Sequence, residues 1–406
     1  MKKNKIKILL SLFFVFFLVT SCSWDDDKGD SFDRTLLIYI DGNNTLSDYA
    51  QKNFESIIHN YVPLRNSGDV LLVYYKDAND VPKLYRIVKD ETSSTEVNQE
   101  IIMKYDASQI SASSETLNTV LSRAHFLFPA KENGLILWSH GTGWLPEDYY
   151  NNPTNTSFSV NQMELNSFGS EEVNNITYEI NIKDLASALP IKYDFIVFDA
   201  CFMGGIEVAY QLKDYCNYFI ASPAEILANG FPYDKLCADL FASKGFELPG
   251  LKNLCVDYFN SYKESSATIG LINTDGLTDL STATKNIINT YRAEHSDYSD
   301  INPNYYQKYY RFNKHWFYDL GDFITSLIDK TAPTDTTAYE AFESAMSKTV
   351  LYEAHTDSFL DSFDLENCSG LSCYIPNPKS DELYKYYYDL DWNKAVSLIR
   401  EEDLND

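Results

Sequence analysis

The chain has 406 residues and a formal net charge of −26, with 59 Asp and Glu against 33 Lys and Arg. A surface this acidic repels the phosphates of nucleic acid, so we expect no nucleic-acid partner. The length, together with 44% hydrophobic residues, is sufficient to bury a large core.

The amino terminus has the pattern of a secretory signal. Four lysines precede an apolar run at 8–19, and the run leads into Thr20, Ser21 and Cys22. This end of the run resembles the lipobox of bacterial lipoproteins, in which the signal is cut before a cysteine that takes up lipid. We therefore predict a lipoprotein signal peptide at 1–21 and lipidation of Cys22. The alternative is an ordinary secretory signal with an incidental cysteine.

The acidic stretch at 23–30 resembles the export tag that follows the lipidated cysteine in Bacteroides-type bacteria. The resemblance implies an outer-membrane lipoprotein exposed at the cell surface and anchored in the membrane through Cys22. We assign 22–33 as an acidic linker. Removal of 1–21 also removes four lysines, so the formal charge changes from −26 to −30, that is −26 minus 4.

From residue 34 onward, strand-like and helix-like segments alternate. Strands are predicted at 35–40, 69–75, 84–88, 135–139 and 196–199, and helices at 47–61, 114–128 and 182–189. The main strands are continuous apolar runs, which is typical of strands buried on both faces of a sheet. The fold class is therefore α/β, with a mostly parallel central sheet flanked by helices.

The alternation continues to about residue 274, after which the pattern becomes mainly helical. The later segments are helices at 203–215, 233–241, 251–262, 280–291, 318–328 and 338–346, and strands at 218–221, 268–273 and 370–375. We therefore place a sheet domain at 34–274 and a smaller, helical C-terminal region at 275–406 that packs on its core. The polar stretch at 143–181 is the longest predicted loop.

Two of the predicted strands end in residues with catalytic chemistry. His140 follows the strand at 135–139, and Cys201 follows the strand at 196–199. The carboxyl ends of parallel strands meet at one edge of a sheet, where open α/β sheets bind ligands. A thiol becomes a nucleophile when a nearby imidazole takes its proton. Singly, Cys201 could be a buried structural thiol and His140 a satisfied strand-end histidine, but together they indicate a cysteine peptidase.

The remaining cysteines indicate neither disulfides nor a metal site. Each of four cysteines lies among apolar residues of a predicted helix or strand: Cys216, Cys237, Cys255 and Cys373. We expect these to be buried free thiols. There is no CxxC pair and no His-rich cluster, so we predict no structural zinc and assign no residue as a metal ligand.

The chain resembles the clostripain family of cysteine peptidases, which share the α/β fold of caspases. The resemblance is carried mainly by 139–141 and 199–203, in that order and each after a strand, and it covers most of the chain after residue 34. Weaker support comes from segments at 39–44, 221–225, 230–233, 318–323 and 369–372. It implies a caspase-like peptidase domain at 34–274 with His140 and Cys201 as the catalytic dyad.

Two further roles follow from the dyad and the resemblance. The backbone amides of Gly141 and Cys201 would donate to the oxyanion that forms on the substrate. In the family, an acidic residue at the position of Asp199 is associated with the pocket for the side chain before the cut. A carboxylate there favours a guanidinium, so we expect cleavage after Arg, with Lys second. The alternative is that Asp199 binds loop amides, and for Glu225 and Asp41 we favour such structural roles over a place in the cleft.

The loop after His140 differs from the family in one respect. Clostripain-like enzymes are commonly activated by self-cleavage after a basic residue in this loop, but 141–182 contains no Lys or Arg. Self-cleavage there with the family's specificity is excluded. We hypothesise that the enzyme is active as a single chain, or is processed by another protease or at another site.

Two other function classes remain open at this point. A surface lipoprotein that binds peptides or glycans without catalysis fits the acidic, Tyr-rich composition but leaves the dyad unexplained. A metal-dependent hydrolase would gather a divalent cation at Asp41, Asp77 and Asp199. For the peptidase we expect protein or peptide substrates, a monomer, and no required cofactor, although Ca²⁺ assists some clostripain relatives.

Overall fold

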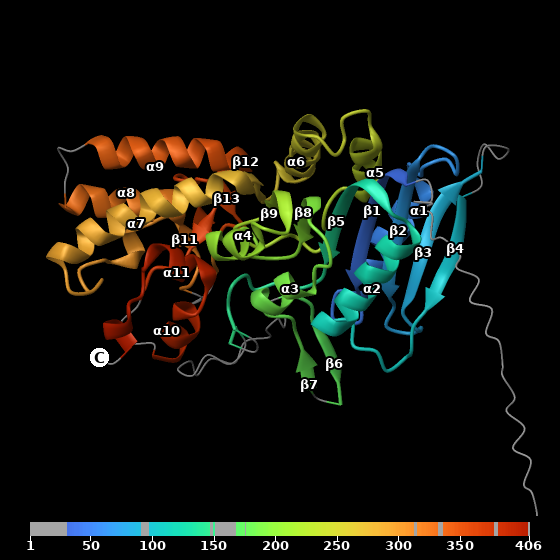
Figure 1. Cartoon of the computed structure of the whole chain (residues 1–406), viewed down its shortest axis with the longest axis horizontal. Coiled ribbons are helices and arrows are strands. Elements are labelled where there is room, and N and C mark those ends of the chain that lie inside the picture. The colour runs from blue at the N-terminus through green and yellow to red at the C-terminus, as the bar shows by residue number, and fades with distance from the viewer. Residues whose placement is uncertain are drawn as a thin grey trace, which may run out of the picture. The chain divides into compact units, whose positions relative to one another are not determined.

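The computed structural model describes most of the chain from residue 31 onward. The described residues are 31–90, 97–146, 149–150, 168–174, 176–311, 315–331, 336–376 and 381–404. The chain from Phe32 onward forms one compact unit (Figure 1). The predicted signal peptide, Cys22 and most of the acidic linker lie outside the described residues. Within the described part, no helix has the length and apolar character needed to cross a membrane.

In the described part of the chain, nine strands form one mixed sheet in the order β12-β10-β9-β8-β5-β1-β2-β3-β4. The run from β9 to β2 is parallel, and the pairs nearer the two edges are antiparallel. The predicted α/β fold with a mostly parallel core is confirmed. The strands are β1 Phe32–Asp41, β2 Asp69–Lys76, β3 Lys83–Lys89, β4 Val97–Lys104, β5 Ala130–Trp138, β8 Tyr193–Asp199, β9 Cys216–Ala221, β10 Thr268–Asn273 and β12 Val350–His355.

Short strand pairs lie outside this sheet. They are β6 Glu171–Val173 with β7 Ile176–Tyr178, β11 Tyr318–Asp319 with β15 Ser372–Cys373, and β13 Ser358–Phe359 with β14 Phe363–Asp364. The pair β6–β7 belongs to the stretch at 143–181 that was predicted as a loop. The strand predicted at 370–375 is reduced to β15.

Helices cover both faces of the sheet because side chains alternate along each buried strand. In β1, Leu37 and Tyr39 enter the core formed with α2, α3 and α4, whereas Leu36 and Ile38 enter the core formed with α1, α5 and α6. Figure 1 shows these helices on the two sides of the strands. Their bounds are α1 Ser47–His59, α2 Ser114–Leu127, α3 Ile182–Ala188, α4 Ile206–Leu212, α5 Tyr233–Phe241 and α6 Leu248–Tyr262.

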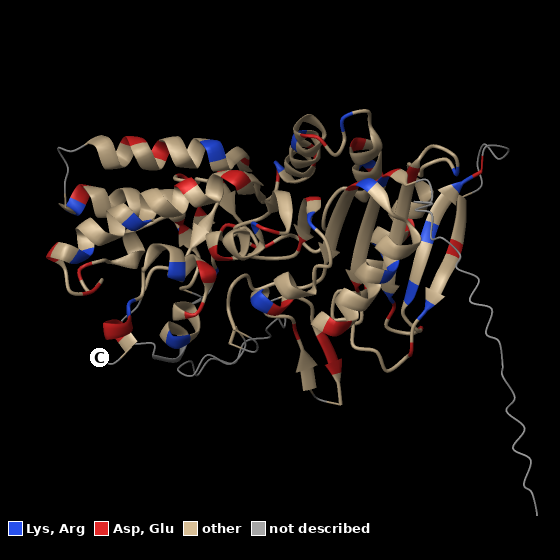
Figure 2. Ribbon diagram, viewed as in Figure 1, with Lys and Arg blue, Asp and Glu red and all other residues tan. Residues whose placement is uncertain are grey.

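The C-terminal helices extend the first of these cores, and β12 adds a strand to the sheet by pairing with β10. Lys and Arg are interspersed with Asp and Glu along α7, α8 and α9 (Figure 2), a pattern that keeps a surface solvated. The helices are α7 Leu277–Glu294, α8 Leu320–Thr331, α9 Thr336–Thr349, α10 Asp381–Tyr388 and α11 Asp391–Val396, and the 3₁₀ turns are η1 Thr274–Gly276, η2 Pro303–Tyr305 and η3 Glu401–Leu404.

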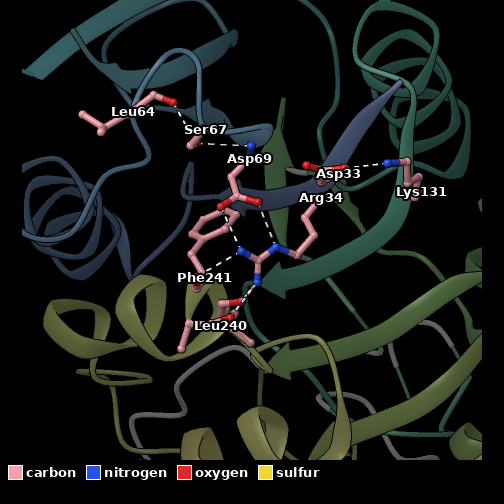
Figure 3. A network of polar contacts seen from close by, with 9 residues as sticks. Asp33, Arg34, Leu64, Ser67, Asp69, Lys131, Leu240 and Phe241 are labelled. Atoms are coloured by element: carbon pink, nitrogen blue, oxygen red, sulfur yellow. Dashed lines mark hydrogen bonds and ion pairs between the residues drawn. The ribbon is translucent and has the colours of Figure 1, made fainter. Parts of the chain in front are cut away.

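Arg34, at the start of β1, joins two strands to α5 (Figure 3). Its guanidinium donates to both carboxylate oxygens of Asp69, at 2.8 and 2.9 Å. It also donates to carbonyls at the end of α5, at 3.1 Å for Phe241 and 2.7 Å for Ala242. A cation is favoured here because the last carbonyls of a helix lack partners within the helix.

The cysteines of the described chain are free thiols. The four expected to be buried are buried: Cys216, Cys237, Cys255 and Cys373. Apolar burial raises the thiol pKa of Cys216 and of Cys237 to about 12, so both stay protonated. These thiols act as packing groups.

Candidate active site

The register between β5 and β8 brings the two sequence-predicted residues to the same level of the sheet. Trp138 lies opposite Asp199 in this parallel pair. His140 and Cys201 each follow two residues later, at the carboxyl edge of the sheet. The sequence argument that strand ends meet at one edge is therefore confirmed for this pair of strands.

The backbone around Cys201 is tightly constrained. Phe202 has a left-handed conformation with φ of 60°, which costs a non-glycine residue on the order of 1–3 kcal/mol. Its ring stacks on Phe317, with centroids 4.5 Å apart, and its amide donates to the carbonyl of Ala224. Gly141 passes so close that a Cβ would lie 2.6 Å from the Cys201 carbonyl oxygen. Glycine is required here because no side chain fits between the two segments.

His140 and Cys201 line one cavity of about 60 Å³. Its other walls come from the residue that precedes α1, from the ends of β5 and β8, and from the segment after β9. The lining residues are Leu46, Trp138, Ser139, His140, Asp199, Ala200, Cys201, Ile226, Leu227, Ala228 and Gly230. The site thus combines a thiol, an imidazole and a carboxylate in one enclosure.

The imidazole of His140 is buried, with 2% of its surface exposed. Burial lowers its pKa to about 4, so the ring is neutral at physiological pH. Nε2 lies 2.8 Å from the Thr45 hydroxyl. A neutral imidazole can accept a proton, which is the state that a general base needs.

The thiol of Cys201 contacts the segment after β9. Sγ accepts a hydrogen bond from the Ile226 amide at 3.3 Å, and Sγ lies 3.6 Å from the Ile226 carbonyl oxygen. Burial, reinforced by the negative charge of Glu225, raises the pKa of Cys201 to about 12, although the Ile226 amide acts against this rise. The thiol is therefore protonated in this structure. Among the described residues, the backbone amides of Gly141 and Cys201 donate no hydrogen bond.

Asp199 accepts hydrogen bonds from a loop and also lines the cavity. Its Oδ2 accepts from the Phe231 amide and the Tyr233 hydroxyl, each at 3.0 Å. Gly230 has a φ of +69°, and a Cβ added at this residue would lie only 2.4 Å from Asp199 Oδ2. The backbone can approach the carboxylate this closely because glycine has no side chain. Burial raises the pKa of Asp199 to about 6, against the lowering effect of these two donors. The carboxylate is thus ionised at neutral pH.

Glu225 pairs with Arg311, a residue that no pattern in the sequence places here. The guanidinium donates to both carboxylate oxygens, with Nη2 to Oε1 at 2.8 Å. Both charges lie close enough to the thiol to act on it, since Arg311 lowers the pKa of Cys201 and Glu225 raises it. Arg311 lies 110 residues after Cys201 in the chain, so only the tertiary fold brings them together.

Asp41 has a structural place beside the site. Its Oδ2 accepts from Ser139 Oγ and from the Ser170 amide, each at 3.2 Å. Burial and the nearby charge of Glu171 raise its pKa to about 8. Among the described residues, no three His, Cys, Asp or Glu side chains form a group that could hold a metal ion. Asp41, Asp77 and Asp199 therefore form no such group.

Comparisons with known proteins agree with the fold. A model of the clostripain family, Peptidase C11, matches residues 38–404. An inactive zymogen C11 protease from Parabacteroides distasonis is similar in structure, with 31% identity and a TM-score of 0.74 over 89% of this chain and 97% of that one. A secreted C11 cysteine protease from Bacteroides thetaiotaomicron, in complex with an irreversible peptide inhibitor, has 28% identity and a TM-score of 0.73 over 90% of this chain and 98% of that one. No curated protein matches.

Proposed function

Because this chain belongs to the clostripain family of cysteine peptidases, we propose that it is an endopeptidase with a His140–Cys201 dyad that cleaves after Arg, with Lys second. The observation that carries the proposal is the shared cavity of the two side chains, at the ends of strands in register. A surface lipoprotein that only binds its ligand would not need a thiol and an imidazole in one enclosure.

The reaction begins when His140 takes the proton of the Cys201 thiol and the thiolate attacks the carbonyl carbon of the scissile bond. The carbonyl oxygen becomes an oxyanion that accepts hydrogen bonds from the amides of Gly141 and Cys201. Such donors each stabilise the transition state by about 3–4 kcal/mol. His140 then protonates the leaving amine, and water hydrolyses the thioester to release the second product.

Substrate entry requires the site to open. A cavity of about 60 Å³ holds only a few water molecules, which is too little for an Arg side chain. The contact between the Cys201 thiol and Ile226 closes one wall. Outward movement of 226–230 would enlarge the pocket and expose the thiol, which removes the main cause of its high pKa.

Asp199 supports the proposed specificity. Its carboxylate is ionised at neutral pH and lines the cavity with the dyad. The Phe231 amide and Tyr233 hydroxyl both bind Oδ2, so neither occupies Oδ1. A guanidinium entering the enlarged pocket would pair with this oriented carboxylate, and an ammonium would make fewer hydrogen bonds.

The test compares fluorogenic peptides with Arg, Lys, Asp or Asn before the cut, using the mature protein in reducing buffer. We expect the order Arg, then Lys, with no cleavage of the other two. Cys201→Ala and His140→Ala should lower kcat by about 10⁴-fold or more. Cys368→Ala, which removes a half-buried free thiol, is the matched control and should keep full activity. Cleavage after Asp or Asn would refute the role of Asp199, and full activity of Cys201→Ala would refute the dyad.

We further propose that Cys22 is lipidated and anchors the enzyme at the outer membrane, facing outward. The basic and apolar residues before Cys22 support this assignment. In cells, Cys22→Ser should move the protein from the membrane fraction to the soluble fraction without changing its specific activity. Equal membrane content of both forms would contradict lipidation.

We also propose that the enzyme works as a monomer without a required cofactor, because the thiol and imidazole supply both nucleophile and base. A chelator should leave kcat/KM unchanged, and added Ca²⁺ should have at most a small effect. Loss of activity with a chelator and recovery with Ca²⁺ would reverse this part of the proposal.

A further inference from the structure

The segment between β1 and α1 is fixed against the strand that carries His140. The side-chain amide of Asn44 donates to the Asp41 carbonyl at 2.9 Å and to Ser139 Oγ at 3.3 Å. Its side-chain oxygen accepts from the Leu46 amide at 2.9 Å. These bonds hold both neighbours of Thr45 in place, so the position of Thr45 relative to β1 and β5 is determined.

Thr45 itself contacts the catalytic imidazole. Its Oγ1 lies 2.8 Å from His140 Nε2, although 95 residues separate the two in the chain. The contact occupies one ring nitrogen from the side of α1. The other ring nitrogen, Nδ1, is therefore the one that we take to exchange a proton with the Cys201 thiol, which lines the same cavity.

We propose that Thr45 is a positioning residue for the reaction: its hydroxyl oxygen accepts Nε2–H of His140 and thereby fixes the tautomer whose Nδ1 is unprotonated. The inference rests on the proposed dyad. When the Cys201 S–H bond breaks, its proton forms the Nδ1–H bond and the electron pair stays on sulfur. The imidazolium keeps its Nε2–H bond to Thr45, and the Nδ1 proton later passes to the leaving amine.

The opposite hydrogen-bond direction would disable the base. A hydroxyl can also donate, and a Thr45 hydroxyl that donated to Nε2 would leave the proton on Nδ1. That tautomer cannot take the thiol proton. Activity therefore requires that Nε2–H of His140 donates to Thr45. Other imidazole bases likewise need one tautomer, which is set by the group that binds their second nitrogen.

The first test compares Thr45→Val, which keeps the shape but lacks the hydroxyl, with Thr45→Ser, which keeps the hydroxyl. Thr45→Val should lower kcat by about 10- to 100-fold with little change in KM, because a hydrogen bond to a charged group is lost. Thr45→Ser should recover most of this loss. Thr290→Val, on the exposed side of α7, where the hydroxyl binds only a carbonyl of its own helix, is the matched control and should match the wild type.

A second measurement separates positioning from a structural effect. The rate of Cys201 alkylation by iodoacetamide should be lower in Thr45→Val than in the wild type at any given pH between 7 and 10, because the neutral imidazole is no longer held in the tautomer that takes the thiol proton. Asp199 and Cys201 are the titratable groups that line the cavity with His140, and all these variants keep them. Equal alkylation profiles, or a loss in Thr45→Ser as large as in Thr45→Val, would overturn the inference.

A third measurement needs no Thr45 variant. In ¹⁵N-histidine-labelled wild-type protein, the His140 signals, assigned by their absence in His140→Gln, should show a protonated Nε2 and an unprotonated Nδ1. The other tautomer would overturn the inference even if Thr45→Val does not fold. Failure of the dyad is distinguishable, since it appears as activity in Cys201→Ala whatever the tautomer.

Discussion

At the scale of single residues, the site is in a resting state. Burial raises the pKa of Cys201 to about 12 and lowers that of His140 to about 4. The proton therefore lies on sulfur and both groups are neutral. An ion pair at this site would be costly unless substrate binding supplies polar partners. Cys201 is half-buried and not fully covered, so its low reactivity follows from its protonation state.

The carboxylate of Asp199 predicts a specific pH dependence. Its pKa is about 6, so the protonated fraction increases as the pH falls through 6, and the attraction for a guanidinium is lost. For Arg peptides, kcat/KM should decrease about tenfold per pH unit below this value. The pKa of His140 is about 4, so its protonation causes a separate decrease of kcat/KM at lower pH.

Asp199→Asn tests the assignment because it keeps the shape and removes the charge. It should lower kcat/KM for Arg peptides by at least about 30-fold, as expected for loss of a buried charge pair, and abolish the limb near pH 6. Alkylation by uncharged iodoacetamide serves as the control and should not slow, because the charge of Asp199 is one of the causes that raise the pKa of Cys201. An unchanged limb in Asp199→Asn would assign it to another group.

Arg311 should tune the thiol through its charge. In Arg311→Gln, the negative charge of Glu225 would be left without its partner near Cys201. The thiol pKa should then rise further, and iodoacetamide should react more slowly at any given pH between 7 and 10. The double variant Arg311→Gln/Glu225→Gln removes both charges and should return the rate toward that of the wild type. If single and double variants react alike, the effect is not electrostatic.

At the scale of elements, Arg34 stabilises the end of the sheet opposite the site. β1 begins beside Arg34 and ends at Asp41 next to the cavity. Arg34→Gln would leave the Asp69 carboxylate and the last carbonyls of α5 without their donor. We expect the free energy of unfolding to decrease by about 2–3 kcal/mol, as for lost hydrogen bonds to a charged group, with kcat unchanged.

Denaturant unfolding measures this difference, and a neighbouring ion pair supplies the control. Lys131 pairs with Asp33 beside the same strand (Figure 3), but these side chains are 67% and 59% exposed. Lys131→Ala should therefore cost less than about 1 kcal/mol. Equal losses for both variants would mean that the hydrogen bonds of the Arg34 guanidinium contribute no more to the free energy of unfolding than an exposed ion pair does.

The buried elements could be predicted from the sequence, whereas the edge elements could not. Continuous apolar runs marked β1, β2, β5 and β8, and the strand ends then indicated His140 and Cys201. The edge strand β4 was missed because its sequence, VNQEIIMK, has neither a continuous apolar run nor regular alternation, and none of its residues is fully buried. Thr45 and Arg311 were missed for another reason: their contacts join segments far apart in the chain, and no local pattern encodes such a pairing.

At the scale of the whole molecule, the C-terminal part supports the turn that carries Cys201. The Ser372 amide donates to the Gly204 carbonyl at 3.0 Å. The Tyr374 amide and the Tyr387 hydroxyl donate to the buried carboxyl of Glu207, in the helix that follows this turn. Residues after 275 also add β12 to the sheet. The geometry of the site therefore depends on the chain as one unit.

This dependence leads to the last prediction, which concerns activation. The stretch 141–182 lacks Lys and Arg, so an enzyme specific for basic residues has no bond there to cut in its own chain. We expect the purified mature protein to hydrolyse Arg peptides as a single chain and to stay intact during the assay. Mass spectrometry of timed samples, taken with the activity, measures both, and the Cys201→Ala protein shows any cleavage by contaminating proteases.

A wild-type chain that splits between His140 and Cys201 and gains activity as it does so, while Cys201→Ala stays whole, would show self-processing. That result would refute single-chain activity. A cut within 141–182 would also refute strict specificity for basic residues, because that stretch contains neither Lys nor Arg, whereas a cut after Lys183 or Lys192 would not.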